Sequence, residues 1–267
     1  MKQSLFAATA ALVFAGGSAL AADLPIRAPT YKAPPPAYFS WTGCYIGGNA
    51  GGASARGSFT TALDSGTHLG AQTNLDRVSA AGTGSDRQSS FIGGGQIGCN
   101  GQAGLLVLGV EGDFSGLSTH PSITGTGVLT TTDPFSITNS VRNDWLATVR
   151  GRAGLAVDRS FIYVTGGAAF SRLHYTQVYT DTLFATTGGF NTSHDQTGWT
   201  IGAGWEYALA PSWSVKAEYL HVRFSSFATT GLITSTTGGT NVMHGTVRED
   251  IDIARVGLNY RFGSPYY

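Results

Sequence analysis

Histidines are the side chains of this sequence best suited to acid–base or ligand chemistry. Four of them fall in segments rich in Thr, Ser, Gly, Asn and Asp: His68, His120, His194 and His244. An imidazole beside a carboxylate, as in His194-Asp195, can act as a general base, and His together with Tyr can ligate haem iron. Histidines in polar segments are more often simply solvated, and no phosphate-binding loop, HExxH or nucleophile elbow accompanies them. We therefore expect a non-catalytic protein without a metal or cofactor, with a haem-binding surface receptor as an alternative.

Nine charged side chains occupy a regular position within apolar segments. In residues 254–262, for example, apolar residues alternate with polar residues or glycine. Because successive side chains of a strand point to opposite faces, each such segment has one apolar face and one polar face. The polar faces carry four acids and five bases: Glu111, Asp113, Arg150, Arg152, Glu206, Lys216, Glu218, Arg255 and Arg261.

The elements that carry these charges are eight candidate strands, at about residues 41–51, 90–100, 104–116, 142–156, 161–173, 197–208, 213–225 and 250–262. Short connections alternate with long polar segments near 52–89, 117–141, 174–196 and 226–249. An even number of strands of about ten residues, with short turns at one end and long loops at the other, is typical of outer-membrane barrels. A soluble sandwich, the alternative, more often has Greek-key connections. We predict an all-β fold: an eight-stranded antiparallel transmembrane up-and-down β-barrel with long extracellular loops and short periplasmic turns.

The composition agrees with such a barrel. The 267 residues include 38 Gly, and only 12% are charged, with 16 Lys and Arg against 16 Asp and Glu. Zero net charge without a basic run removes the electrostatic argument for nucleic-acid binding. Low charge content follows when every strand gives one face to lipid. The excess of glycine, about twice the usual share of roughly 7%, leaves room beside long charged side chains in a narrow interior.

The N-terminal segment predicts export. A short basic start precedes an apolar stretch at residues 5–15, and Ala19-Leu20-Ala21 fits a cleavage site, which places the cut between Ala21 and Ala22. An uncleaved membrane anchor is the alternative, but the apolar stretch is too short to span a bilayer. Residues 22–38 contain five of the nine prolines and predict an extended periplasmic linker. We expect a signal peptide at 1–21, this linker at 22–38 and the barrel at 39–267, in the Gram-negative outer membrane.

Several segments resemble a known family. They are ADLP at 22–25, SWTGCYIGGNAG at 40–51, FIGGGQIG at 91–98, GVEGD at 109–113, RGRAG at 150–154 and VGLNYRF at 256–262. Together they resemble the small alphaproteobacterial outer-membrane β-barrel surface proteins, a porin-like family, over essentially all of residues 22–262. The resemblance implies roles in envelope integrity and surface display, with small-pore or haem-binding activity in some members.

The interior of an eight-stranded barrel is about wide enough for side chains to fill. We therefore expect the nine charges to pair into a network that plugs the lumen, since an unpaired buried charge costs several kcal/mol. The alternative is a gate that rearranges its pairs, which would make the protein a small-solute porin or ion channel.

Aromatic residues near the strand ends predict two girdles at the membrane interfaces. Four lie toward the short-turn end and three toward the loop end: Trp41, Phe161, Trp213 and Phe262, then Trp145, Phe170 and Trp199. Phe262 also resembles the terminal aromatic residue read by the barrel-assembly machinery, a role for which Tyr267 is the alternative.

Two further groups suggest covalent or lipid contacts. Cys44 and Cys99 lie low on neighbouring strands and would form a disulfide if the register sets them opposite; two unpaired thiols are the alternative. The expected partners are outer-membrane lipid, lipopolysaccharide and the assembly machinery, and the sequence does not identify a protein partner. Three loop arginines could contact lipopolysaccharide phosphates, although acidic neighbours in the same loop favour simple solvation: Arg56, Arg77 and Arg87 beside Asp64, Asp76 and Asp86.

Overall fold

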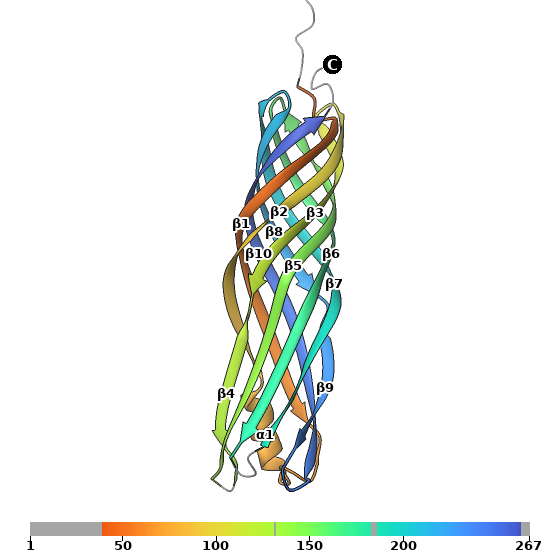
Figure 1. Ribbon diagram of the computed structural model, residues 1–267. Helices are drawn as coiled ribbons and strands as arrows, with labels where there is room; N and C mark the ends of the chain where they lie inside the picture. Colours follow the sequence, from red (N-terminus) through yellow and green to blue (C-terminus); the bar gives the residue numbers. More distant parts are fainter. Residues whose placement is uncertain (1–38, 131, 183–185, 263–267) are drawn as a thin grey trace, which may run out of the picture. The chain divides into compact units, whose positions relative to one another are not determined.

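The computed structural model describes residues 39–130, 132–182 and 186–262 (Figure 1). They form one short helix, α1 (Gln72–Ala81), and ten strands: β1 (Gly43–Leu63), β2 (Gly84–Ala103), β3 (Leu106–Thr119), β4 (Ser122–Val128), β5 (Pro134–Val157), β6 (Ser160–Asp181), β7 (Thr186–Ala210), β8 (Trp213–Phe224), β9 (Phe227–Thr234) and β10 (Thr240–Phe262). The predicted signal peptide with its Ala21–Ala22 cleavage site, the Pro-rich linker and Tyr267 lie outside the described residues.

The ten strands close into a barrel of eight antiparallel strands, because two of the eight are interrupted. The order is β1-β2-β3-β5-β6-β7-β8-β10, and β10 pairs again with β1 along its whole length. The strand β4 prolongs β3 after a break that contains Pro121, and β9 prolongs β8 after Ser225-Ser226; β4 pairs with β5 and β9 with β10. The prediction of an eight-stranded up-and-down barrel is therefore confirmed.

Among the described residues, no helix is both long and apolar enough to cross a membrane.

The strands are much longer than the sequence predicted. Most of the segments expected as loops, at 52–89, 117–141, 174–196 and 226–249, are strand, and that part of the prediction is wrong. The reason is visible in β10, where the apolar face changes sides. Val256 and Leu258 point outward, whereas Ile253, Ile251 and Val247 point into the barrel and polar residues face outward between them. The alternation of apolar and polar residues continues, but the apolar residues now face the lumen and the polar ones face outward. Thr, a residue common in strands, supplies much of this outer face.

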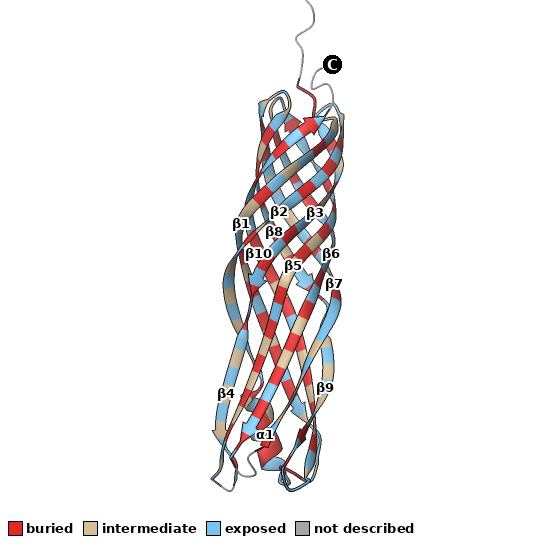
Figure 2. Ribbon diagram, viewed as in Figure 1, coloured by how far each residue is buried: buried red, intermediate tan, exposed pale blue. Residues whose placement is uncertain are grey.

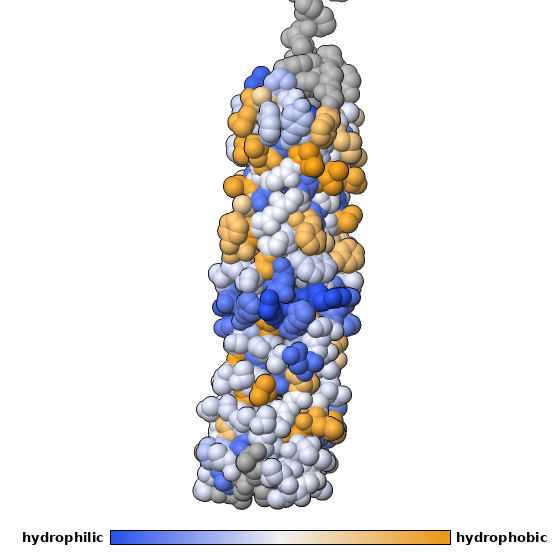
Figure 3. All heavy atoms as spheres, viewed as in Figure 1, coloured by the Kyte–Doolittle hydropathy of each residue, from blue (hydrophilic) through white to orange (hydrophobic). Residues whose placement is uncertain are grey.

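The change of sides marks the edge of the lipid-facing region. We call the end with the short connections the turn end and the end with α1 the loop end. Exposed apolar side chains cover the turn half, and aromatic residues form its outer edge: Phe91, Phe114, Trp145, Phe170, Trp199 and Tyr219. A hydrophilic band follows (Figure 3). We call it the charged belt, and it contains Arg56, Arg87, Arg142, Asp144, Arg172, Asp195, Arg223, Arg248, Asp250 and Asp252. The lipid-crossing segments end at this belt.

Buried residues, which point into the barrel, alternate with exposed or half-buried residues along most strands, whereas β4 has no buried residue (Figure 2). From the turn end, the lumen holds an aromatic cluster around Trp41, the charged network, an aliphatic cluster around Ile253, and two further apolar clusters that reach α1. The two clusters at the loop end include Tyr175 and Tyr179.

Inward-facing glycines allow the strands to curve this tightly. At Gly47, Gly51, Gly94 and Gly167, an added Cβ would lie within 3 Å of backbone atoms of the adjacent strand. No other residue fits there without moving the neighbouring strand. The glycine excess is thus partly a consequence of the narrow lumen.

Candidate functional site

The charged network lies in the middle of the lipid-crossing half and is built from five strands. The strands β3 and β5 set Glu111 directly opposite Arg150, and β8 and β10 set Glu218 opposite Arg255. All these positions share the inward parity that alternates with lipid-facing residues. The side chains are at most 7% exposed. The sequence-predicted members that the fold brings together are Glu111, Asp113, Arg150, Arg152, Glu206, Lys216, Glu218 and Arg255.

Glu111 is the centre of this network. Its two oxygens lie 2.8 and 2.9 Å from Lys216 Nζ, and it also accepts a hydrogen bond from Arg150. Arg152 approaches within 3.3 Å, and the hydroxyl of Tyr45 donates a hydrogen bond of 2.5 Å. With Arg255 at 3.9 Å, one carboxylate is therefore surrounded by four cations and a phenol, which compensates its removal from water.

Asp113 and Glu218 extend the network toward the loop end. Arg255 bridges them, with Nη1 at 2.9 Å from Asp113 Oδ1 and Nη2 at 2.7 Å from Glu218 Oε2. Arg150 contacts both acids, at 3.1 Å each. Toward the turn end, Arg152 Nη2 donates a hydrogen bond of 2.6 Å to Glu206 Oε2. Four acids thus face four bases, so that the network is neutral as a whole.

The ninth predicted member, Arg261, does not belong to the network. Its guanidinium donates to the carbonyl oxygens of Ser40 (2.7 Å) and Pro211 (3.3 Å) and stacks on Phe39 and Trp41. Within the described ranges it makes no salt bridge to a carboxylate. The prediction is wrong here because parity assigns a face but not a height along the barrel axis.

Two residues predicted for the girdle at the turn end lie in the lumen instead. Trp41 and Phe161 are at most 1% exposed, and their ring centroids are 5.3 Å apart. They form an aromatic cluster on the turn-end side of Arg152. The guanidinium carbon of Arg152 lies 4.1 Å from the ring centroid of Tyr163. Trp41 precedes β1 and turns inward, so the girdle prediction is wrong for these two. The other five predicted girdle residues are exposed or half-buried: Trp145, Phe170, Trp199, Trp213 and Phe262.

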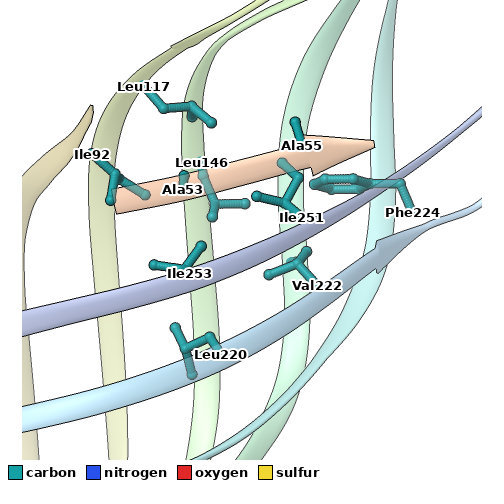
Figure 4. Packing of buried hydrophobic residues seen from close by; sticks show 11 residues of the cluster. Ala53, Ala55, Ile92, Leu117, Leu146, Leu220, Val222, Phe224, Ile251 and Ile253 are labelled. Carbon is teal, nitrogen blue, oxygen red and sulfur yellow. The ribbon is translucent and has the colours of Figure 1, made fainter. Parts of the chain in front are cut away.

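An aliphatic cluster fills the lumen on the loop side of the network. Side chains from opposite walls of the barrel meet in it, among them Ile92, Leu146, Leu220 and Ile253 (Figure 4). Ile92, Leu220 and Ile253 are fully buried. The cluster narrows the lumen with apolar side chains, and the two residues that flank Leu146 in register, Ser115 and Ser171, are buried as well.

One acid lies just beyond this cluster, at the height of the charged belt. Glu249 is fully buried and accepts hydrogen bonds at Oε2 from Asn143 and Gln196. Its Oε1 has no hydrogen-bond partner in the described part of the chain. Burial raises the pKa of Glu249 to about 7, against smaller opposite effects of the two amide hydrogen bonds. Sequence reasoning missed this residue because it assigned the segment to a loop.

The two cysteines lie directly opposite each other on β1 and β2 and are joined by a disulfide. Both are exposed on the outer face near the turn end. The bond links the first two strands of the barrel, β1 and β2.

The loop histidines are not gathered into one site. His68 is buried and lies 2.8 Å from Asp181 Oδ2, and His244 pairs with Asp64 at 3.0 Å. His194 stacks on Phe227 on the outer wall, and His120 is exposed between β3 and β4. Within residues 39–130, 132–182 and 186–262, no group of three or more His, Cys, Asp or Glu could hold a metal ion.

One Ser–His–Asp row does occur, on the outer wall. Ser193 Oγ lies 2.8 Å from His174 Nδ1, and His174 Nε2 lies 4.0 Å from Asp144, whose other oxygen accepts from Arg142. The row crosses three neighbouring strands, β5, β6 and β7. At 4.0 Å, Asp144 is beyond hydrogen-bond distance of His174, so its carboxylate does not orient the imidazole as in a catalytic triad.

The charged belt consists largely of exposed ion pairs between neighbouring strands. Arg172 binds Asp195 at 2.6 Å, and Arg223 binds Asp250 at 2.6 Å. The hydrogen bond from Arg172 lowers the pKa of Asp195 below its ordinary value. Arg56, Arg87 and Arg248 have no such carboxylate partner within the described ranges.

Two tyrosines in the lumen were missed by sequence reasoning. Tyr45 binds Glu111, and the hydroxyl of Tyr163 donates to Glu218 at 2.9 Å. Both occupy the inward parity of their strands. That position was a usable signal, because a polar hydroxyl on the charged face can join the network.

A closed antiparallel barrel of eight strands with an apolar outer face and a charged interior defines an outer-membrane β-barrel. The model of the family described as "Outer membrane protein beta-barrel domain" matches residues 7–262, and the chain belongs to this family. It is thus a protein of the outer membrane.

The chain is similar to the 31 kDa outer-membrane immunogenic protein of Brucella melitensis and to that of Brucella suis. Each is 34% identical over 268 residues, which cover 97% of this chain and 100% of the relative. Among solved structures, it is similar to the outer membrane protease OmpT of Escherichia coli, with a TM-score of 0.46 and 8% identity over 84% of this chain and 98% of that one. OprG of Pseudomonas aeruginosa has a TM-score of 0.39 and 11% identity over 84% and 99%.

Proposed function

We propose that the protein is a non-conducting, non-catalytic surface barrel that contributes to envelope integrity and presents its loop end outside the cell. The observation that carries this proposal is the filled lumen. The network, with Glu111 and Arg150 each 1% exposed, and the aliphatic cluster with Ile253 at 0%, follow each other along the axis. Side chains without water contact at two successive heights argue against the porin alternative.

The length of the barrel supports a role at the surface. The strands continue past the charged belt with a polar outer face. The helix α1 lies inside the barrel at the loop end, where Leu75 and Val78 are buried. Because the turn half is the part with an apolar outer face, the loop half must project into water. Such a rigid polar projection suits contact with neighbouring molecules or a host. The name of the Brucella relatives, an immunogenic protein, is compatible with surface exposure.

A haem-binding receptor is less well supported. The four candidate histidines are separated, and His68 is engaged with Asp181 inside the loop end. The Ser193–His174–Asp144 row does not favour hydrolytic chemistry either, because Asp144 lies 4.0 Å from the imidazole.

Solute flux into liposomes tests the proposal. Vesicles that contain the refolded protein should not swell in small sugars or amino acids, whereas vesicles with a general porin should. Rapid swelling with the wild-type protein would replace the proposed function by that of a small-solute porin.

We also propose that the barrel-assembly machinery reads Phe262. This residue ends β10, pairs with Cys44 of β1 where the barrel closes, and is 54% exposed. Phe262→Ala should lower the amount of folded protein in the outer membrane, while Phe114→Ala, another exposed aromatic residue, should not. Loss in both variants would indicate a general stability effect instead.

A further inference from the structure

Three arginines of the charged belt form a cluster on the outer wall of β2, β1 and β10. Arg56 of β1 is in register with Arg87 of β2 on one side and with Asp250 of β10 on the other. Arg248 follows on β10, opposite Ser58. All three arginines are exposed.

No guanidinium of the cluster has a carboxylate within 4 Å in the described ranges, although Arg87 is close enough to Asp252 to help lower the pKa of that carboxyl. Like charges directly opposite on neighbouring strands destabilise a sheet, and Arg56 and Arg87 are such a pair. The carboxylate of Asp250 is engaged with Arg223 at 2.6 Å, and that of Asp86 accepts from the backbone of Ser122. The only hydrogen bond from the three guanidiniums within the described ranges joins Arg56 to Ser85 at 3.3 Å. An anion at this point would relieve the repulsion.

A recess in the wall accompanies the charges. A pocket of about 410 Å³ is lined by Arg56, Arg248 and Asp250 together with the hydroxyls of Ser58, Thr60 and Thr246. Guanidinium forks with adjacent hydroxyl donors are the groups that bind phosphate best.

The position of the cluster fits a lipid of the outer leaflet. Arg56, Arg87 and Arg248 belong to the charged belt, which borders the lipid-facing region beyond exposed aromatic residues such as Phe91 and Tyr219. With the loop end outside the cell, this is the height of the headgroup phosphates of the outer leaflet.

We propose that the wall of β2, β1 and β10 binds a phosphorylated outer-leaflet glycolipid of the lipid A class, with its phosphate at Arg56, Arg87 and Arg248. The assignment rests on the proposed orientation, in which the loop end lies outside the cell.

Native mass spectrometry of the protein, released from micelles that contain lipid A, tests this site. The variant Arg56→Gln/Arg87→Gln/Arg248→Gln should bind lipid A at least about tenfold more weakly than the wild type, as expected for the loss of several charge-assisted hydrogen bonds. The matched control is Arg142→Gln/Arg172→Gln, which removes two arginines of the same belt that already have Asp partners. It should bind like the wild type.

Two further arms identify the source of the phosphate. Dephosphorylated lipid A should bind the wild type as weakly as phosphorylated lipid A binds the triple variant. Equal weakening in the control variant, or no loss in the triple variant, would overturn the site. Inorganic phosphate that binds as tightly as lipid A would exclude a lipid ligand. None of these results depends on whether the lumen conducts.

Discussion

The substitution Glu249→Gln offers a quantitative test of the dry lumen. The glutamine keeps the shape of the side chain and an oxygen that can accept from Asn143 and Gln196. Burial raises the pKa of Glu249 from an ordinary 4.5 to about 7. The native state therefore binds this proton more tightly than the unfolded state does, so the stabilisation is complete below pH 4.5 and is lost as the pH rises through about 7.

The size of the effect follows from the two pKa values. Each pKa unit is worth about 1.4 kcal/mol, so the wild type should lose about 3 kcal/mol relative to the glutamine variant between about pH 4 and about pH 8. Urea unfolding in detergent micelles, followed by tryptophan fluorescence, measures both proteins at each pH. Comparing the two cancels the titration of the other carboxylates. Asp250→Asn is the control, because Asp250 lies on the same strand but is only half-buried and paired with Arg223.

A difference between wild type and Glu249→Gln that stays constant with pH would refute the reasoning. It would mean that water reaches Glu249 and keeps it ionised, and the lumen would then be open from the loop end down to the aliphatic cluster.

Two further predictions concern the filling of the lumen. Lys216→Met should cost about 3–5 kcal/mol of unfolding free energy, because it leaves Glu111 buried with less positive charge, and Lys216→Met/Glu111→Gln should recover part of that loss; no recovery in the urea unfolding curves would show that the two residues do not act as a pair. Phe161→Ala should cost about 3–5 kcal/mol, since its ring is buried in the lumen, whereas Phe114→Ala, on the lipid-facing wall, should cost less. Equal losses in the same assay would contradict the inward placement of Phe161.

The lipid-crossing half of the barrel was predictable because one rule governs it. Apolar residues such as Val256 and Leu258 face lipid, and the intervening positions face the lumen, so parity alone placed Glu111 and Arg150 inside. The rule reverses beyond the charged belt. There Ile251 and Val247 face inward and Thr or charged residues face water, a pattern that the sequence analysis assigned to loops.

Heights along the barrel axis were not predictable from parity. Trp41 and Arg261 were assigned to a girdle and to the network, yet they stack on each other at the turn end of the lumen. Their placement depends on the stagger between strands and on how the chain enters β1, and one sequence does not specify either. The helix α1 was missed for a related reason. Its buried apolar residues, Leu75 and Val78, are too few to reveal a helical period in a polar segment.

Single-channel recording across a planar bilayer tests the closed lumen most directly. With the wild-type protein inserted, we predict a flat current trace without stepwise events over the usual range of voltage and salt, and the same for Glu111→Ala, because the aliphatic cluster around Ile253 remains in place. Reproducible unitary steps in the wild type would contradict the account, and steps that appear only in Glu111→Ala would show that the charged network is a gate.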